Sequence, residues 1–337
     1  MTHLYKSFLL RFFISCVLIL LTINTTNAQG ESKPEQLHEI TIYVMPTLFP
    51  IDWTSPSTLF TSMKNCYLKT VTVPDNYLLG HIAVQINTPL LPKPLYTAMT
   101  SASPMEKVDL VLKQKIGYGI FGATLQGRLE SEKELHHKLD VYAKRKKLAF
   151  MTFSVSEQAA QRMIEFIHKF STNINDQYAP CNFYGGAFWP RFENEGSGCS
   201  AFGMALLEIA QATPVESKEW LVSVKVPMKL IGGEYNRFKR IKNTTIKQTN
   251  SWYTGNGNEN EDFISHFVYE PSIMFDWIVK RQNETNSSFM ATQKDGIPGL
   301  YFDKRDVAIN ATEPIFDKRK HKNLFIESYF GKLALDN

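Results

Sequence analysis

The sequence contains little cysteine and no large excess of charge of either sign. Its four cysteines, Cys16, Cys66, Cys181 and Cys199, are too few and too scattered for a zinc ligand set. The formal net charge of +4 over 337 residues is too small to indicate binding to nucleic acid. Internal repeats and low-complexity tracts are lacking as well, and the hydrophobic fraction of 43% is typical of a packed globular protein.

Motifs for metals and nucleotides are also missing. Gly117-x-Gly119-x-x-Gly122 matches the glycine pattern of a nucleotide-binding loop, but it lies in a strand-like run that no helix follows. His136 and His137 are adjacent, so their side chains would point to different faces of a helix or strand and make a poor metal-binding pair. We therefore expect neither a metal ion nor an organic cofactor.

The N-terminus predicts export. Lys6 and Arg11 precede an apolar run over residues 12–21, and Thr26-Asn27-Ala28 fits a small-x-small cleavage site. Residues 1–28 are thus expected to be a bacterial signal peptide, which would place the protein in the periplasm or the outer envelope. An uncleaved membrane anchor is the alternative.

Three cysteines follow this segment, and an odd number in an exported protein indicates at least one free thiol. Either Cys66 and Cys181 form a disulfide, or all three cysteines are reduced. In both arrangements Cys199 has a free thiol that could act as a nucleophile.

The rest of the chain predicts an α+β fold in which an antiparallel sheet packs against helices. Five segments are rich in β-branched and apolar residues and predict strands: residues 40–45, 78–86, 108–112, 116–125 and 220–227. Ser55 before Pro56 predicts the start of one helix, and Ser154-Val-Ser-Glu157 fits the capping box of another. We expect residues 29–212 to form the core and residues 213–337 to form a C-terminal extension packed on it.

The glycine-rich turn around Cys199 is the most informative stretch. Gly196 and Gly198 allow a sharp turn and the close approach of another group. Phe202 and Leu206 recur at helical spacing, so a buried helix should begin at or just after Cys199. A thiol at a helix N-terminus has a lowered pKa, and the N–H groups there can hold an oxyanion. Cys199 is therefore a candidate nucleophile, the alternative being a small buried core residue.

His81 is the candidate base. It follows Gly80 at the start of a predicted strand and shares one face of that strand with Gln85. The opposite face carries an apolar stripe: Ile82, Val84 and Ile86. Alone, His81 would be a surface residue. Beside Cys199, it would complete a nucleophile–base pair.

The order of these features resembles a known family. Gly80-His81 opens a strand, a capped helix and an aromatic, glycine-rich loop over residues 181–190 follow, and Gly198-Cys199 opens a further helix. This order is similar to that of the circularly permuted papain-like NlpC superfamily, in the branch that includes the lecithin–retinol acyltransferase-like proteins. The resemblance covers about residues 75–212. Gly198 departs from the pattern, because many relatives have Asn at that position.

The resemblance implies a cysteine hydrolase of the peptidase or amidase kind on a permuted papain-like core. Cys199 would attack an amide or ester carbonyl to form a thioester, with His81 as general base and acid. The third residue, which orients the histidine, has three candidates: Gln85, Gln126 and Glu130. In an exported bacterial protein the expected substrate is a peptide or amide bond of the cell wall, and a lipid ester or amide is the next choice.

A different class of function stays open. The aromatic loop over residues 183–189 could bind a glycan or a peptide if the protein is a non-catalytic envelope protein of the same fold. The reactivity of the Cys199 thiol separates the two classes, because a catalytic thiolate alkylates rapidly below the usual thiol pKa and a buried structural thiol does not.

Overall fold

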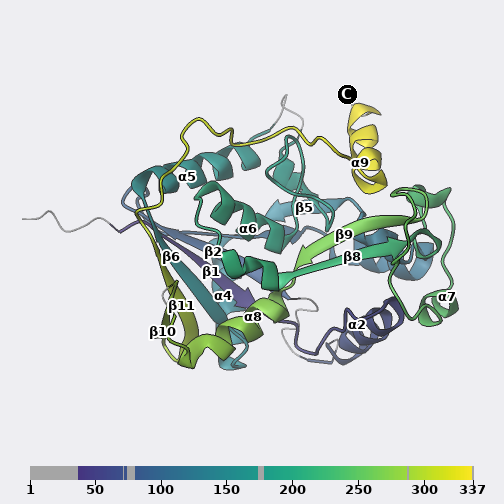
Figure 1. The fold of residues 1–337 in the computed structure, drawn as a ribbon, viewed down its shortest axis with the longest axis horizontal. Coiled ribbons are helices and arrows are strands. Elements are labelled where there is room, and N and C mark those ends of the chain that lie inside the picture. The colour runs from purple at the N-terminus through teal and green to yellow at the C-terminus, as the bar shows by residue number, and fades with distance from the viewer. Residues whose placement is uncertain (1–36, 71, 74–79, 174–177, 287, 336–337) are drawn as a thin grey trace, which may run out of the picture. The chain divides into compact units, whose positions relative to one another are not determined.

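The computed structural model describes residues 37–70, 72–73, 80–173, 178–286 and 288–335 (Figure 1). The predicted signal peptide, residues 1–28, lies outside these described residues. From Leu37 onward the chain forms one unit. Within the described ranges, no helix has the length and apolar character needed to cross a membrane.

The described residues have a mixed α+β fold in which antiparallel pairing dominates, as predicted. The strands are β1 (Glu39–Met45), β2 (His81–Asn87), β3 (Leu95–Thr97), β4 (Met99–Ser101), β5 (Leu125–Leu129), β6 (Ala149–Val155), β7 (Phe183–Tyr184), β8 (Leu221–Pro227), β9 (Phe263–Tyr269), β10 (Met290–Lys294) and β11 (Ile297–Lys304). The α-helices are α2 (Pro56–Thr70), α3 (Pro104–Val108), α4 (Glu132–Lys144), α5 (Glu157–Ser171), α6 (Cys199–Ile209), α7 (Asn243–Lys247), α8 (Pro271–Lys280) and α9 (Leu324–Leu335).

The largest sheet in the described part of the chain has the strand order β10-β11-β6-β1-β2-β3. β1 lies at its centre and pairs antiparallel with both β2 and β6, with Ile42 opposite Val84 on one side and opposite Met151 on the other. β11 pairs parallel to β6. The central strands are buried on both faces, which explains their nearly continuous apolar sequences.

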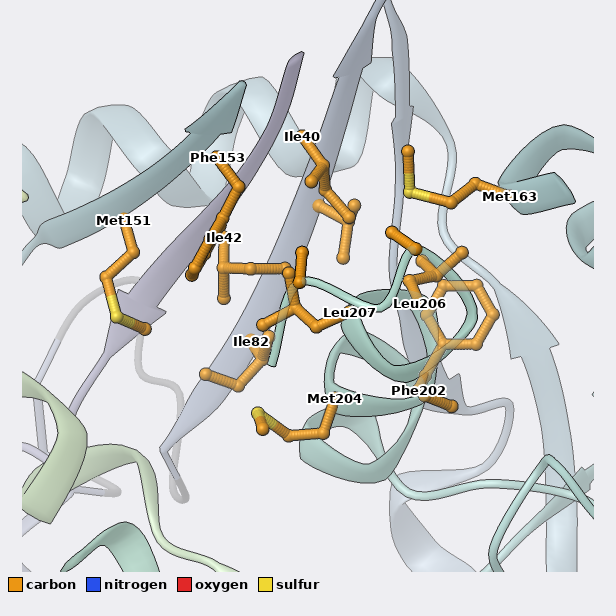
Figure 2. Close-up of a cluster of buried hydrophobic side chains, with 14 of the residues drawn as sticks. Ile40, Ile42, Ile82, Met151, Phe153, Met163, Phe202, Met204, Leu206 and Leu207 are labelled. Atoms are coloured by element: carbon orange, nitrogen blue, oxygen red, sulfur yellow. The ribbon is translucent and has the colours of Figure 1, made fainter. Parts of the chain in front are cut away.

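Helices cover the two faces of this sheet. On one face, isoleucines of β1 and β2 pack with Met151 and Phe153 of β6 against Phe202, Leu206 and Leu207 of α6 (Figure 2). α5 and α8 add their apolar stripes to the same cluster. On the other face, a second cluster joins Tyr43, Ala83 and Phe150 to Leu135 and Tyr142 of α4. The alternation of side chains along each strand thus supplies both cores.

Residues 213–337 do more than pack on the core. Their strands β10 and β11 extend the large sheet beyond β6, and α8 packs across β1, β6 and β11. The backbone of β6 thus uses β11, from the predicted C-terminal extension, to satisfy its hydrogen bonds.

Two of the predicted strands are wrong. Residues 108–112 belong to α3 and to a π-helical turn, η1 (Asp109–Gln114), and residues 118–121 form a short 3₁₀ helix, η2 (Tyr118–Phe121), with β5 beginning only at Leu125. Pro104 at the first turn of α3 favours helix, and Lys115 in the left-handed conformation (φ 58°) ends η1. Residues 115–119 pack against residues 230–241, a contact that no local pattern contains.

The predicted helix over the Ser154–Glu157 region is confirmed, but its cap was misplaced. Ser154 remains in β6, paired with Glu39 of β1, and Ser156 is the N-cap of α5. The Ser156 hydroxyl accepts a hydrogen bond from the backbone N–H of Ala159 at 3.2 Å. The pairing of β6 with β1 thus takes precedence over the local capping pattern, and the helix cap lies two residues later than predicted.

Candidate active site

Cys199 is the first residue of α6, as predicted, and its side chain is buried against β2. Gly203, one turn later, lets the helix approach β2 closely, because a Cβ at that position would lie 2.8 Å from the Ile82 side chain. Sγ of Cys199 lies 4.0 Å from the carbonyl oxygen of Gly80. Helix α6 and the start of strand β2 thus bring together Cys199 and Gly80, which are 119 positions apart in the sequence.

The turn before Cys199 is held by buried charge. Glu195 is fully buried, and its two carboxylate oxygens accept hydrogen bonds from Arg319 at 2.5 and 2.8 Å. The same carboxylate accepts a bond from the backbone N–H of Trp189. Gly196 fits directly against Phe183, since a Cβ there would lie 2.0 Å from the Phe183 carbonyl oxygen. The C-terminal residues therefore help to fix the turn that carries the thiol.

His81 lies at the start of β2 and is buried, contrary to the alternative of a surface residue. Its Nε2 atom lies 2.5 Å from Oε2 of Glu130, the residue that follows β5. The other carboxylate oxygen of Glu130 accepts a hydrogen bond from Lys138 of α4. Because Glu130 occupies Nε2, the Nδ1 atom of His81 remains for the hydrogen bond with Cys199.

Of the three predicted candidates for the orienting residue, only Glu130 contacts His81. Gln85 lies on the strand face of His81, but its side chain accepts a hydrogen bond from the hydroxyl of Tyr43 at 2.8 Å. Gln126 is exposed, and its contacts are made by its backbone: the N–H donates to the carboxylate of Glu106, and the carbonyl oxygen accepts from the N–H of Ala102. A buried carboxylate beside a histidine supports the charged imidazolium better than either amide would.

Hydrogen bonds and charges outweigh burial in setting the pKa of the thiol. Burial alone would raise the pKa of Cys199, but the hydrogen bond and the positive charge of His81 lower it, and so do the Ile82 backbone N–H and the Tyr184 hydroxyl. The result is a pKa lowered from 9.0 to about 7. For His81, burial would lower the pKa, but Cys199 and Glu130 together raise it above its usual range. The pair is therefore suited to hold a thiolate and an imidazolium near neutral pH.

Tyr184 at the end of β7 is a site residue that sequence reasoning treated only as part of an aromatic loop. Its hydroxyl donates to Sγ of Cys199, and the backbone N–H of Cys199 points to the same hydroxyl. Burial, followed by the neighbouring thiolate, raises the pKa of Tyr184 well above its usual range, so it remains a donor. The adjacent Gly185 packs closely against the Ala123 carbonyl oxygen and the Phe188 ring, where a Cβ would lie within 2.8 and 2.9 Å, but no local sequence pattern marks Tyr184 for this role.

Lys107 of α3 is a second site residue that the sequence did not mark. Its Nζ atom lies 4.5 Å from the ring centroid of Tyr184, a cation–π contact. Burial lowers the pKa of Lys107, and the nearby Cys199 and Glu106 oppose this effect. Lys107 directly precedes the segment 108–112 that was predicted to be a strand, so the helix that brings this cation to the thiol was not predicted.

A cavity of about 330 Å³ opens beside Sγ of Cys199. Its walls are mostly apolar and include side chains from the segment before α2, from α2 and η2, and from the loop after β7: Ile51, Phe60, Met63, Phe121, Phe188 and Trp189. Besides Cys199, its polar lining includes Lys107 and Tyr184 near the thiol and two buried side chains on the β9 side, His266 and Glu270. Burial lowers the pKa of His266 to about 4, so it is a neutral group at pH 7.

Cys181 is a free thiol, so the optional bridge between Cys66 and Cys181 is not formed. Burial raises the pKa of the Cys181 thiol, the opposite of the shift at Cys199. The two thiols thus differ in the property that governs nucleophilicity.

Comparisons of this chain with family models, with curated proteins and with solved structures find no match. The arrangement of Cys199, His81, Glu130 and Tyr184 is therefore the basis for assigning a function.

Proposed function

We propose that this protein is a cysteine acyl hydrolase or acyltransferase that forms a thioester on Cys199. The observation that carries the proposal is a thiol of lowered pKa, hydrogen-bonded to a histidine that a buried carboxylate orients, at the wall of an apolar cavity. The resemblance to the permuted papain-like hydrolases is compatible with this reading and remains a prediction.

In the first step, the Cys199 thiolate attacks the carbonyl carbon of a bound ester or amide, and a carbon–sulfur bond forms. The backbone N–H groups at the start of α6 and the Tyr184 hydroxyl, both close to Cys199, would stabilise the negative oxygen that develops. The His81 imidazolium then gives its proton to the leaving alcohol or amine as the bond to the carbonyl carbon breaks. Glu130 keeps the imidazole oriented and favours its charged form during this step.

In the second step, an acceptor attacks the thioester while His81 removes its proton. With water as acceptor, the products are a carboxylic acid and the restored thiol. With an alcohol or amine, the acyl group is transferred instead. Both outcomes use the same residues, so the access of water to the cavity decides between them.

The cavity favours a substrate with an apolar acyl chain over a cell-wall peptide. Aliphatic and aromatic side chains dominate its walls, whereas cell-wall peptides carry many charged and amide groups that would lose their hydration there. Among the two substrate classes expected from the sequence, the lipid ester or amide is therefore the better fit. Lys107 would face the polar part of such a substrate, close to the scissile bond.

The test is to trap the thioester with p-nitrophenyl esters of increasing chain length. We expect an acyl adduct on the peptide that contains Cys199, detected by mass spectrometry, and faster p-nitrophenol release with longer chains. Cys199→Ser and His81→Ala should lose the adduct, and Cys181→Ser, a matched change at another buried free thiol, should keep it. If Cys199 alkylates readily but no ester of any length acylates it, the acyl-transfer proposal is wrong.

A further inference from the structure

Two segments distant in sequence form one exposed surface at the side of the cavity. The Arg240 side chain donates to the carbonyl oxygen of Lys113 at 2.8 Å, and the backbone N–H of Ile241 donates to that of Lys115 at 2.7 Å. These bonds hold residues 112–115 against residues 237–247. We refer to these two segments together as the docking surface.

The docking surface presents apolar side chains to solvent. Phe238 is 80% exposed and Leu112 is 58% exposed. Phe238 and its neighbour Arg237 both adopt left-handed backbone conformations, with φ of 57° and 50°. This conformation is unfavourable for a bulky aromatic residue. Because the Phe238 side chain is exposed, its packing within the chain does not offset that conformational cost. An exposed aromatic side chain on a strained turn instead suggests contact with something outside the chain.

Basic residues surround these apolar side chains. Residues 237–247 contain no acidic residue and five exposed basic ones: Arg237, Lys239, Arg240, Lys242 and Lys247. Lys113 and Lys115 are exposed on the adjoining segment, where Asp109 pairs with Lys113 at 2.7 Å. The docking surface therefore carries a local excess of positive charge, which creates a positive field at this part of the protein.

The mouth of the cavity lies at this surface. Lys115, Ile241 and Asn243 belong to the docking surface and also line the cavity that contains Sγ of Cys199. Lys115 and Asn243 are exposed, so the cavity communicates with solvent there. An amphiphile that entered at this edge would pass its apolar part along the walls toward the thiol.

We propose that the docking surface binds the face of a lipid bilayer that contains anionic phospholipids. Phe238 and Leu112 enter the boundary between head groups and acyl chains, while the basic residues contact the phosphates. The combination favours a membrane over a soluble polyanion, because a polyanion in water offers no apolar layer for Phe238. Membrane binding does not depend on the chemistry of Cys199, whereas delivery of an acyl substrate from the membrane rests on the proposed function.

The experiment is co-sedimentation with vesicles of phosphatidylcholine alone or mixed with phosphatidylglycerol. The protein used begins at Gln29, so that the apolar N-terminus does not contribute, and it keeps the whole unit from Leu37. We expect binding to the mixed vesicles that weakens with added salt, and little binding to phosphatidylcholine. Phe238→Ser should weaken binding roughly tenfold, as expected for removing one buried aromatic side chain. Arg237→Gln and Lys239→Gln should each weaken it about fivefold.

Two controls keep the proposal separate from protein stability and from catalysis. Met290→Ser changes an apolar residue that is 61% exposed on β10, far from α7 in Figure 1, and should bind like the wild type. Cys199→Ser should also bind like the wild type while losing acylation. If Phe238→Ser binds as well as Met290→Ser does, the proposal is wrong. It is equally wrong if only the basic residues matter, because that result assigns the surface to a soluble polyanion.

Discussion

Replacing His81 with alanine should raise the pKa of the Cys199 thiol. The ordinary value of 9.0 is lowered to about 7 against the effect of burial, and the largest lowering contributions are the hydrogen bond and charge of His81. The Ile82 backbone N–H and the Tyr184 hydroxyl remain in the variant, but they must then oppose burial alone. We therefore expect the pKa to return to about 9 or higher.

The size of the effect follows from the thiolate fraction. At pH 7 this fraction is about one half for a pKa of 7 and about one per cent for a pKa of 9, a fifty-fold decrease. A thiolate of higher pKa is also intrinsically more nucleophilic, by roughly six- to tenfold over this interval. The alkylation rate at pH 7 should therefore fall only about five- to eightfold. The midpoint of the rate profile should nevertheless move upward by about two pH units.

The assay is the rate of iodoacetamide labelling of the Cys199 peptide between pH 5 and pH 10. His266→Gln is a matched control, because His266 is also a buried histidine that lines the cavity and no contact with Cys199 involves it. Its midpoint should stay near pH 7. A wild-type midpoint near 9, or a midpoint unchanged by His81→Ala, would refute the assignment of His81 as the partner of the thiol.

Three other changes test separate parts of the structure. Tyr184→Phe removes a hydrogen-bond donor to Cys199. The pKa of the Cys199 thiol should therefore rise, and acylation by activated esters should slow by up to about 100-fold. Glu130→Gln removes the charge that raises the pKa of His81, so the alkaline limb of the acylation profile, where His81 loses its proton, should move to lower pH and the maximum rate should fall roughly 100-fold. Phe202→Ala creates a cavity in the fully buried core, and urea unfolding should show a loss of about 3–5 kcal/mol.

The parts of the site that depend on local signals were predictable. The glycine turn and the helical spacing after Cys199 lie within one short stretch, and the alternation after His81 lies within one strand. Glu130 was one of three candidates because it follows a strand end. Its selection needed the register of β4 with β5 and the position of α4, which the sequence does not contain.

The remaining parts depend on contacts between distant segments. Residues 108–112 and 116–125 have strand-like composition, yet residues 109–114 and 118–121 form helical turns. Residues 230–241 pack against residues 113–119 between and within these turns, a contact between distant segments. Lys107 reaches the site only because of that change. The role of Tyr184 could not be predicted for a different reason. The aromatic loop contains several similar side chains, and only the fold shows which of them lies beside Cys199.

The parallel pairing of β11 with β6 has a consequence for the order of folding. Phe150 of β6 pairs with Gly299, so a large part of the chain must be synthesised before that edge of the sheet is covered. Until then β6 presents an open row of backbone groups, a site at which unfinished chains can associate. Arg319, which holds Glu195 in the turn before Cys199, arrives later still. The thiol therefore acquires its final surroundings only after Arg319 has been synthesised, and chains that end before this residue should be inactive and prone to aggregate.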